Sequence, residues 1–187
     1  MKKYIFLNIC VTVFALSCNQ PTEPQSHAET IQSQPDYLIA FEDTTNNTCG
    51  FKDSKGNIII PSGKYGFTTT DTFRNYAIVA IPDLGFVGID RKEKILYQVF
   101  PFDNGPDRPS EGLFRIVKDN KIGYADIKTG EVVIQPQYPC AYPFATGKAQ
   151  VAIKCDEIKS VEYSIWESKD WFWIDKTGKK WSPKNLF

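Results

Sequence analysis

Apolar and polar residues divide the chain of 187 residues into three parts. Residues 4–16 are almost continuously apolar, residues 19–36 are almost wholly polar, and residues 37–187 alternate over short stretches. In the last part, Gly, Pro, Asn and Asp separate the short runs, and a spacing of this kind is typical of strands joined by turns. No sustained helical period follows the first part. The pattern predicts a signal peptide over 1–17, a linker over 18–36 and an all-β domain over 37–187.

The predicted domain contains an internal repeat. The repeated segment begins with glycine and an aromatic residue, continues through Asp-x-x-Gly and a β-branched run, and ends at proline. Its aspartates set the period, because Asp53 and Asp90 are 37 residues apart, Asp90 and Asp126 are 36 apart, and Asp126 and Asp175 are 49 apart. The longer last interval indicates an insertion of about a dozen residues. The four copies are Gly50–Pro61, Gly85–Ile95, Gly123–Pro136 and Trp171–Trp181.

Each copy has a local physical interpretation. An apolar strand enters the Asp-x-x-Gly turn, in which the Asp side chain accepts from backbone amides and Gly takes a positive φ. A β-branched strand such as Ile58-Ile59-Ile60 returns, and proline, as at Pro61, is expected to end it. A Gly-x-Ala-x-Val strand, best seen at residues 147–151, precedes the next copy. We therefore predict an antiparallel β-meander repeat array of about three and a half units, closed into a partial propeller or extended as a superhelix.

These motifs resemble the WG repeat, also called KWG, over roughly residues 48–181. Two copies depart from the pattern. The second has Glu93 in place of the turn glycine and lacks the proline, and the fourth has Phe172 in place of its first glycine. The resemblance implies an all-β array on bacterial secreted and surface proteins, with no common catalytic activity.

The N-terminus resembles a bacterial lipoprotein signal. Lys2 and Lys3 precede an apolar run that is too short to span a bilayer, which requires about 20 residues. The run ends at Ala15-Leu16-Ser17-Cys18, which resembles a lipobox with Ala15 where leucine is usual. We expect lipidation at Cys18, with cleavage by ordinary signal peptidase as the alternative. Asn19 follows in place of the aspartate linked by resemblance to inner-membrane retention, so the expected location is the outer membrane, facing the periplasm, or, without the lipid, outside the cell.

Charge and composition argue against several classes of function. The chain has 22 basic and 22 acidic residues, and loss of residues 1–17 removes two lysines, so the mature charge is 20 − 22 = −2. No basic footprint of a nucleic-acid binder is present. The only histidine, His27, lies in the expected linker, so the domain offers neither a Ser-His-Asp arrangement nor an imidazole zinc site. Residues 103–107 (Asp-Asn-Gly-Pro-Asp) fail the calcium-loop pattern and are interpreted as a turn. We expect no catalytic, cofactor or metal site and no enzyme activity.

The cysteines and tryptophans supply the remaining candidates. Cys49, Cys140 and Cys155 lie in the domain, and an exported compartment permits disulfides. Cys140 and Cys155 bracket one strand, so they are the favoured pair, with all thiols reduced as the alternative. The four tryptophans either cap the end of the array or bind a ligand, and they are Trp166, Trp171, Trp173 and Trp181.

The leading functional hypothesis is a non-catalytic binding or structural lipoprotein of the cell envelope, held to a membrane by its lipid and contacting another protein. A glycan or peptidoglycan binder that uses the C-terminal aromatics is the first alternative. An inhibitor or immunity protein against a secreted toxin is the second.

Overall fold

The computed structural model describes residues 36–159 and 164–182. These residues form an all-β fold of antiparallel strands with no helix among them. The described residues therefore contain no helix that is long and apolar enough to cross a bilayer. The expected signal peptide, Cys18, His27 and all but the last residue of the expected linker lie outside the described part of the chain.

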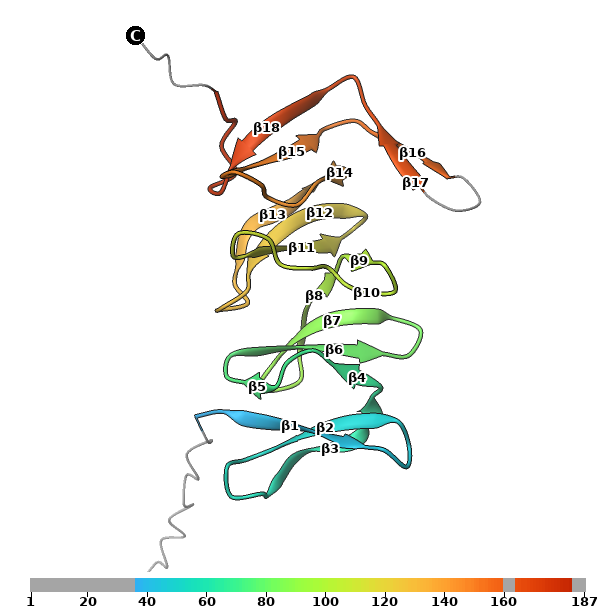
Figure 1. The fold of residues 1–187 in the computed structure, drawn as a ribbon, viewed down its shortest axis with the longest axis vertical. Coiled ribbons are helices and arrows are strands. Elements are labelled where there is room, and N and C mark those ends of the chain that lie inside the picture. Colours follow the sequence, from blue (N-terminus) through green and yellow to red (C-terminus); the bar gives the residue numbers. More distant parts are fainter. Residues whose placement is uncertain (1–35, 160–163, 183–187) are drawn as a thin grey trace, which may run out of the picture. The chain divides into compact units, whose positions relative to one another are not determined.

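The repeat is a meander of three antiparallel strands. In each of the first three units the middle strand carries the repeat motif and pairs with the strand before it and the strand after it. Unit 4 keeps the first two strands, and its third is reduced to a bridge between Ile174 and Lys180. Units 1 to 4 follow one another in chain order in Figure 1. The strands are β1 (Leu38–Asp43), β2 (Thr48–Lys52) and β3 (Ile58–Tyr65) in unit 1; β6 (Tyr76–Ile81), β7 (Gly85–Asp90) and β8 (Ile95–Val99) in unit 2; β11 (Leu113–Lys118), β12 (Lys121–Asp126) and β13 (Val132–Tyr138) in unit 3; and β15 (Lys148–Ala152) and β18 (Trp171–Asp175) in unit 4.

Short strands link the units and complete the sheets. One sheet has the order β3-β2-β1-β5, a second β13-β12-β11-β8-β7-β6-β4, and a third β14-β15-β18. Units 2 and 3 thus share one seven-stranded sheet through the β8–β11 pair. The linking strands are β4 (Phe67–Thr68), β5 (Thr72–Phe73), β9 (Pro101–Phe102), β10 (Gly105–Pro106) and β14 (Cys140–Ala141).

The aspartate turns form as the motif predicts. The Asp53 carboxylate accepts from the backbone amides of Lys55 (2.9 Å) and Asn57 (2.8 Å). Asp90, Asp126 and Asp175 accept in the same way from amides two to four residues ahead. These bonds satisfy amides that the tight turn leaves without strand partners.

The prediction that proline ends the returning strand is wrong. β3 continues through Pro61 to Tyr65, and β13 continues through Pro136 to Tyr138. In both units the pairing register shifts at this point, between Cys49 and Phe51 and between Ile122 and Tyr124. Proline can remain in the strand because the bulge takes it out of the hydrogen-bond ladder.

The first glycine of the motif allows this bulge. A Cβ on Gly50 would overlap the Ile60 carbonyl oxygen and the Phe41 ring, and a Cβ on Gly123 would overlap the Ile134 carbonyl oxygen. The two backbones therefore approach more closely than any side chain permits.

Contacts between units recur with the repeat. The aspartate turn of each unit lies against the third strand of the unit before it. In the turn of unit 2, Glu93 accepts from the Tyr65 hydroxyl (2.9 Å). In the turn of unit 3, the Gly130 carbonyl accepts from the Tyr97 hydroxyl (2.9 Å), and in unit 4, Gly178 lies beside the Ile134 side chain. Each unit thus covers a buried residue of its neighbour, as stacked repeats do.

Candidate binding site

Unit 4 differs from the others in its first hairpin. The first and second strands are joined by residues 44–47 in unit 1, 82–84 in unit 2 and 119–120 in unit 3, but by residues 153–170 in unit 4. We call residues 153–170 the insertion hairpin. It contains β16 (Asp156–Lys159) and β17 (Ser164–Glu167), which pair antiparallel. The structure thus locates the insertion that the repeat period predicted.

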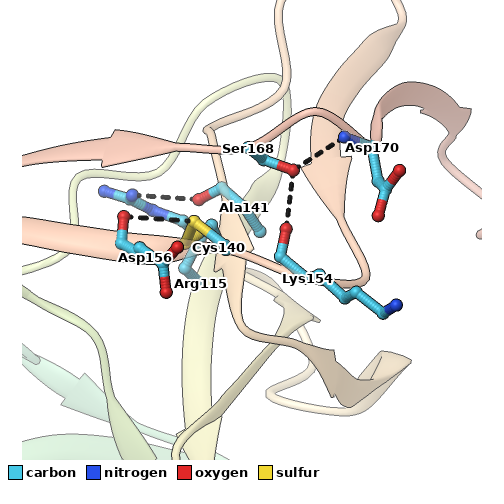
Figure 2. The surroundings of a disulfide bond; sticks show 8 residues. Arg115, Cys140, Ala141, Lys154, Asp156, Ser168 and Asp170 are labelled. Atoms are coloured by element: carbon cyan, nitrogen blue, oxygen red, sulfur yellow. Dashed lines mark hydrogen bonds between the residues drawn. A yellow bond between two sulfur atoms is a disulfide. The ribbon is translucent and has the colours of Figure 1, made fainter.

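A disulfide fastens the base of the insertion hairpin. Cys140, which is buried on β14, is bonded to Cys155, and their Cα atoms are 6.1 Å apart. This is the pair that the sequence favoured. Figure 2 shows Ser168, near the C-terminal end of the insertion, beside Lys154 at the same base: its hydroxyl donates to the Lys154 carbonyl (2.6 Å) and accepts from the Asp170 amide (2.9 Å). Both ends of the insertion are therefore tied together beside the last strands of the array.

Aromatic packing holds the insertion hairpin against the segments that enter and leave unit 3. The Trp166 ring on β17 meets Phe100 at 5.8 Å and Tyr142 at 5.4 Å between centroids, both edge to face. Trp171 reaches the same Tyr142 ring at 5.3 Å. Contacts of this geometry are favourable beyond the apolar area they bury. Trp166 and Trp171 therefore act together around one tyrosine.

The backbone of Tyr142 is itself fixed by two hydrogen bonds. Its carbonyl accepts from the Tyr124 hydroxyl (2.7 Å), and its amide donates to the Gln150 carbonyl (2.9 Å). Burial raises the pKa of the Tyr124 phenol, so this group stays protonated and keeps donating.

Beneath these rings lies a buried ion pair that the sequence did not reveal. Asp107 and Arg115 are both buried, and the Arg115 Nε lies 3.1 Å from each carboxylate oxygen of Asp107. The Arg115 amide also donates to Asp107 (2.7 Å), and its Nη1 donates to the Ala141 carbonyl (3.2 Å), which Figure 2 shows. The guanidinium stacks on the Phe100 ring at 4.0 Å. Burying two charges is tolerable only with such complete pairing, so this pair fixes the loop that carries Phe100 and Phe102.

Together these elements enclose a groove of about 920 Å³. We call it the aromatic groove. One wall comes from the loop of unit 2, another from unit 3 and a third from the insertion hairpin. Among its lining residues are Phe102, Val117, Asn120, Tyr142, Ile165 and Trp166. Phe102, Tyr142 and Ile165 are exposed, so the groove presents apolar surface to solvent. A second hollow of about 650 Å³ shares Trp166 with the aromatic groove and is lined also by Trp171.

The other two candidate tryptophans lie in a separate cluster. Trp173 on β18 and Trp181 after it are both exposed, and the Lys148 Nζ lies over their rings at 4.6 Å and 4.3 Å. The four tryptophans therefore form two pairs, one around Tyr142 and one around Lys148. Nothing in the described contacts joins them into one platform.

Other residues singled out from the sequence occupy structural positions. Asp103 and Asn104 have positive φ values of 48° and 59° and form the β9–β10 turn. Cys49 is a buried free thiol whose pKa is raised by burial. Within residues 36–159 and 164–182, no three His, Cys, Asp or Glu side chains gather in a way that could hold a metal ion.

The family comparison concerns units 3 and 4. Residues 122–154 match the family model of the WG containing repeat, from β12 through β13 and β14 to β15. These residues form a WG repeat. The match thus begins with the second strand of one meander and ends just after the first strand of the next. The chain matches no curated protein and no solved structure. The protein is therefore a β-repeat protein that carries a WG repeat. Its other units are recognised by their strand pairing, because units 1 and 2 repeat the three-stranded antiparallel meander of unit 3.

Proposed function

We propose that this protein is a non-catalytic lipoprotein of the cell envelope that binds another protein through the aromatic groove. The observation that carries the proposal is the groove itself, because exposed apolar side chains from two repeat units and an insertion converge there. Contiguous exposed apolar surface on a soluble domain marks interaction sites. A volume of about 920 Å³ is at the upper end for a small-molecule site and suits the side chains of a short peptide segment.

The walls of the groove are fixed before any partner arrives. The Cys140–Cys155 disulfide holds the insertion hairpin, and the Asp107–Arg115 pair holds the opposite loop. A preorganised surface binds more tightly because it loses less conformational freedom on association. Fixed walls around an open groove support a binding role over a purely structural one, because a segment that only filled space in the fold would not need an open groove.

The binding test uses variants at exposed groove residues. Phe102→Ala and Ile165→Asp remove apolar surface without disturbing the core, since both side chains are exposed. After crosslinking in intact cells, the parent should capture an envelope protein that these variants recover at least about ten-fold less, as expected for a loss of about 1.4 kcal/mol. Leu84→Asp is the matched control, because Leu84 is similarly exposed but lies in the β6–β7 turn. Equal recovery by the groove variants and the control would contradict the proposal.

A glycan ligand is the second candidate, and the aromatic lining favours it. Phe102, Tyr142 and Trp166 could stack on sugar rings. Sedimentation with purified peptidoglycan or polysaccharide distinguishes the two candidates. A glycan binder should sediment with the polymer and lose this property in Phe102→Ala and Trp166→Ala. A protein binder should stay in the supernatant.

The non-catalytic part of the proposal rests on the absence of histidine from residues 37–187 and on the structural duties of the turn aspartates. Any substrate turnover that a single carboxylate substitution abolishes would overturn it.

The membrane part of the proposal rests on Cys18. Mass spectrometry of the mature N-terminus should find an acylated cysteine, and Cys18→Ala should move the protein from the membrane fraction to the soluble fraction. The domain should keep its circular dichroism spectrum, because the polar linker separates residue 18 from the first strand at Leu38. An unmodified Cys18 at the mature N-terminus would show that the protein is secreted without a lipid.

A further inference from the structure

The Cys140–Cys155 disulfide lies at the hinge between unit 4 and the insertion hairpin. Cys140 on β14 pairs with Ala152, the last residue of β15, and Cys155 follows just beyond that strand. β16 and β17 form a sheet of their own, which no other strand of the described residues joins. The hairpin therefore leaves the array through two short connections, residues 153–155 and 168–170, and the disulfide fixes the first of them.

The non-covalent ties of the hairpin are weaker than this bond. The Ser168 hydroxyl bonds Lys154 and Asp170, which both belong to the insertion, so these bonds close its base without joining it to the array. The Trp166 ring does cross to the array, where it meets two aromatic rings edge to face. A two-stranded hairpin by itself is only marginally stable in water. The disulfide is thus the strongest of the ties that position the hairpin.

The two halves of the disulfide differ in their access to solvent. Cys140 is 3% exposed, whereas Cys155 is half-buried. Cys155 also lines the second hollow of about 650 Å³, together with Lys154, Trp166 and Trp171. The rate of thiol–disulfide exchange depends on which sulfur an attacking thiolate can reach. A thiolate from solvent therefore approaches this bond from the Cys155 side, through the hollow.

We propose that Cys155 is a thiol–disulfide exchange site, at which a dithiol releases the insertion hairpin and opens the aromatic groove. One thiolate of the dithiol attacks the Cys155 Sγ, the bond to Cys140 breaks, and the Cys140 sulfur leaves with the electron pair and takes up a proton. The second thiol of the dithiol loses its proton and attacks the dithiol sulfur of the mixed disulfide, so the Cys155 sulfur leaves as a thiolate and is protonated in turn. The dithiol thereby loses two electrons and two protons and becomes a disulfide, and the two cysteines gain both.

Release of the hairpin removes one wall of the aromatic groove. Ile165 and Trp166 line the groove from the hairpin, whereas Phe102 and Tyr142 line it from the array. Tyr142 follows Cys140 in the same short segment, so the disulfide joins the hairpin to the segment that carries the facing ring. The groove is therefore complete only while the disulfide is intact. This effect on binding rests on the proposed function, whereas exchange at Cys155 does not.

Alkylation of the folded protein tests the exchange site. The full chain, in a mild non-ionic detergent, is treated with dithiothreitol as the dithiol and then with iodoacetamide, and peptide mass spectrometry identifies the modified cysteines. Cys155 should be alkylated while Cys49, a buried free thiol, stays unmodified and reports that the domain is folded. If Cys155 reacts only under conditions that also modify Cys49, the disulfide opens only on unfolding and the proposal is overturned.

Hydrogen exchange tests the release of the hairpin. In the reduced protein, the amides of residues 153–159 and 164–170 should exchange at least about ten-fold faster than in the oxidised protein, with β15 and β18 unchanged. Cys155→Ser should match the reduced protein without any reductant. Cys49→Ala keeps the disulfide and should match the oxidised parent. Equal exchange before and after reduction, or faster exchange in β15 and β18 as well, would show that the bond does not hold a hinge and would overturn the proposal.

Crosslinking in intact cells connects the exchange site to the groove. Cys155→Ser should recover the envelope protein at least about ten-fold less than the parent does. Equal recovery would show that the groove does not need the disulfide, and would overturn the effect on binding. If the parent itself captures no protein, the proposed function fails, whereas alkylation and hydrogen exchange still decide whether Cys155 is an exchange site that releases the hairpin.

Discussion

Units 2 and 3 are the same meander built from different residues, and their differences come in matched sets. At the first motif position unit 3 has Gly123, its third strand carries Pro136, and the register shifts between Ile122 and Tyr124. Gly123 lies three residues before the turn aspartate Asp126, and three residues before Asp90 unit 2 has Val87, although its copy of the motif starts earlier, at Gly85. Unit 2 also has no proline, and Val87 pairs in regular register with Gln98. The glycine, the proline and the bulge beside them are therefore present together in unit 3 and absent together from unit 2. The bulge needs glycine because the two backbones approach closely there, and the proline needs the bulge because it cannot donate to the ladder.

A second matched set lies one residue further along. Unit 3 pairs Tyr124 on the second strand with Ile134 on the third, whereas unit 2 pairs Gly88 with Tyr97. A Cβ on Gly88 would overlap the Tyr97 ring, so the ring of unit 2 fills the space above its own glycine. The aromatic residue of this pair is therefore on the second strand in unit 3 and on the third strand in unit 2, and it is buried in both units. Unit 2 looks degenerate by residue identity, yet it keeps a buried aromatic ring at this pair.

The largest predicted effect comes from breaking this exchange. Gly88→Phe should destabilise the protein by about 3 kcal/mol, because its side chain must displace the buried Tyr97 ring. Tyr97→Ile should cost about 2 to 3 kcal/mol through the cavity it leaves and the hydrogen bond to Gly130 that it loses. The double variant has the arrangement of unit 1, which pairs Phe51 with Ile60, and should recover stability. Urea unfolding of all four proteins measures the coupling free energy.

A coupling of about 2 kcal/mol is expected, since the two residues are in direct contact. Additive losses of stability in the double variant would mean that a ring on the second strand cannot replace the Tyr97 ring on the third. The Phe51–Ile60 pair of unit 1 and the Gly88–Tyr97 pair of unit 2 would then not be equivalent.

The next effect concerns the bulge of unit 3 between Ile122 and Tyr124. Gly123→Ala should cost about 2 kcal/mol or more, because the new Cβ meets backbone atoms of Ile134 and Pro136 that cannot rotate away. Gly56→Ala is the control. Gly56 has a φ of 91° with open space around it, so alanine there meets only backbone strain of about 1 kcal/mol. If thermal unfolding shows the control to be the more damaging substitution, close approach is not the reason for Gly123.

These matched sets explain what sequence reasoning could and could not find. The aspartates repeat without exception, so the period, the turn chemistry and the all-β meander were predicted and are confirmed. The pairing of Gly88 with Tyr97 keeps a buried aromatic ring but places it on the opposite strand, so unit 2 resembled a degraded copy. The continuation of β3 through Pro61 was missed because proline is read as a strand breaker unless a bulge is known to be there.

The candidate site was harder to predict for a different reason. The Cys140–Cys155 pair could be chosen from spacing, and the tryptophans could be singled out by type. The tryptophans divide into two clusters because of their contacts with Tyr142 and Lys148, and nothing in the sequence around those two residues marks them as the centres of clusters. The Asp107–Arg115 pair was hidden because Asp107 lies in a turn-forming stretch, and only burial distinguishes it from a solvated aspartate.

A smaller effect tests how unit 2 manages without its turn glycine. Glu93 takes a φ of 60° where unit 1 has Gly56, and its carboxylate accepts from Lys64 (2.8 Å) and Tyr65 (2.9 Å) of unit 1. Glu93→Ala keeps the unfavourable backbone and loses both contacts. Glu93→Gly loses the same contacts but relieves the backbone, so it should be more stable than Glu93→Ala by about 1 kcal/mol in urea unfolding. Equal stabilities would show that the left-handed turn costs nothing here.

The smallest effect is on stability in acid, and it is measured by comparing the parent with a variant in which the turn residue Asp126 of unit 3 cannot take up a proton. Bonds from the Thr129 amide, and then from the Lys128 amide, hold the pKa of Asp126 below its usual value of 3.8. A carboxylate whose folded pKa is depressed contributes stability above its unfolded pKa, and this is lost as pH falls through the folded value. The parent should therefore lose stability below about pH 4. Asp53 and Asp175 add to this loss, because bonds from Asn57 and Thr177 lower the pKa of each.

Asp126→Asn isolates the contribution of unit 3. The asparagine oxygen can still accept from the two turn amides, so the turn should form, but no proton is taken up. Urea midpoints measured between pH 5 and pH 2 should fall less steeply for this variant than for the parent. The variant should also be slightly less stable at pH 7, where a charged acceptor makes the stronger hydrogen bond. Parallel pH profiles for the two proteins would place the acid sensitivity elsewhere in the chain and remove the charge on Asp126 from the reasons the turn is stable.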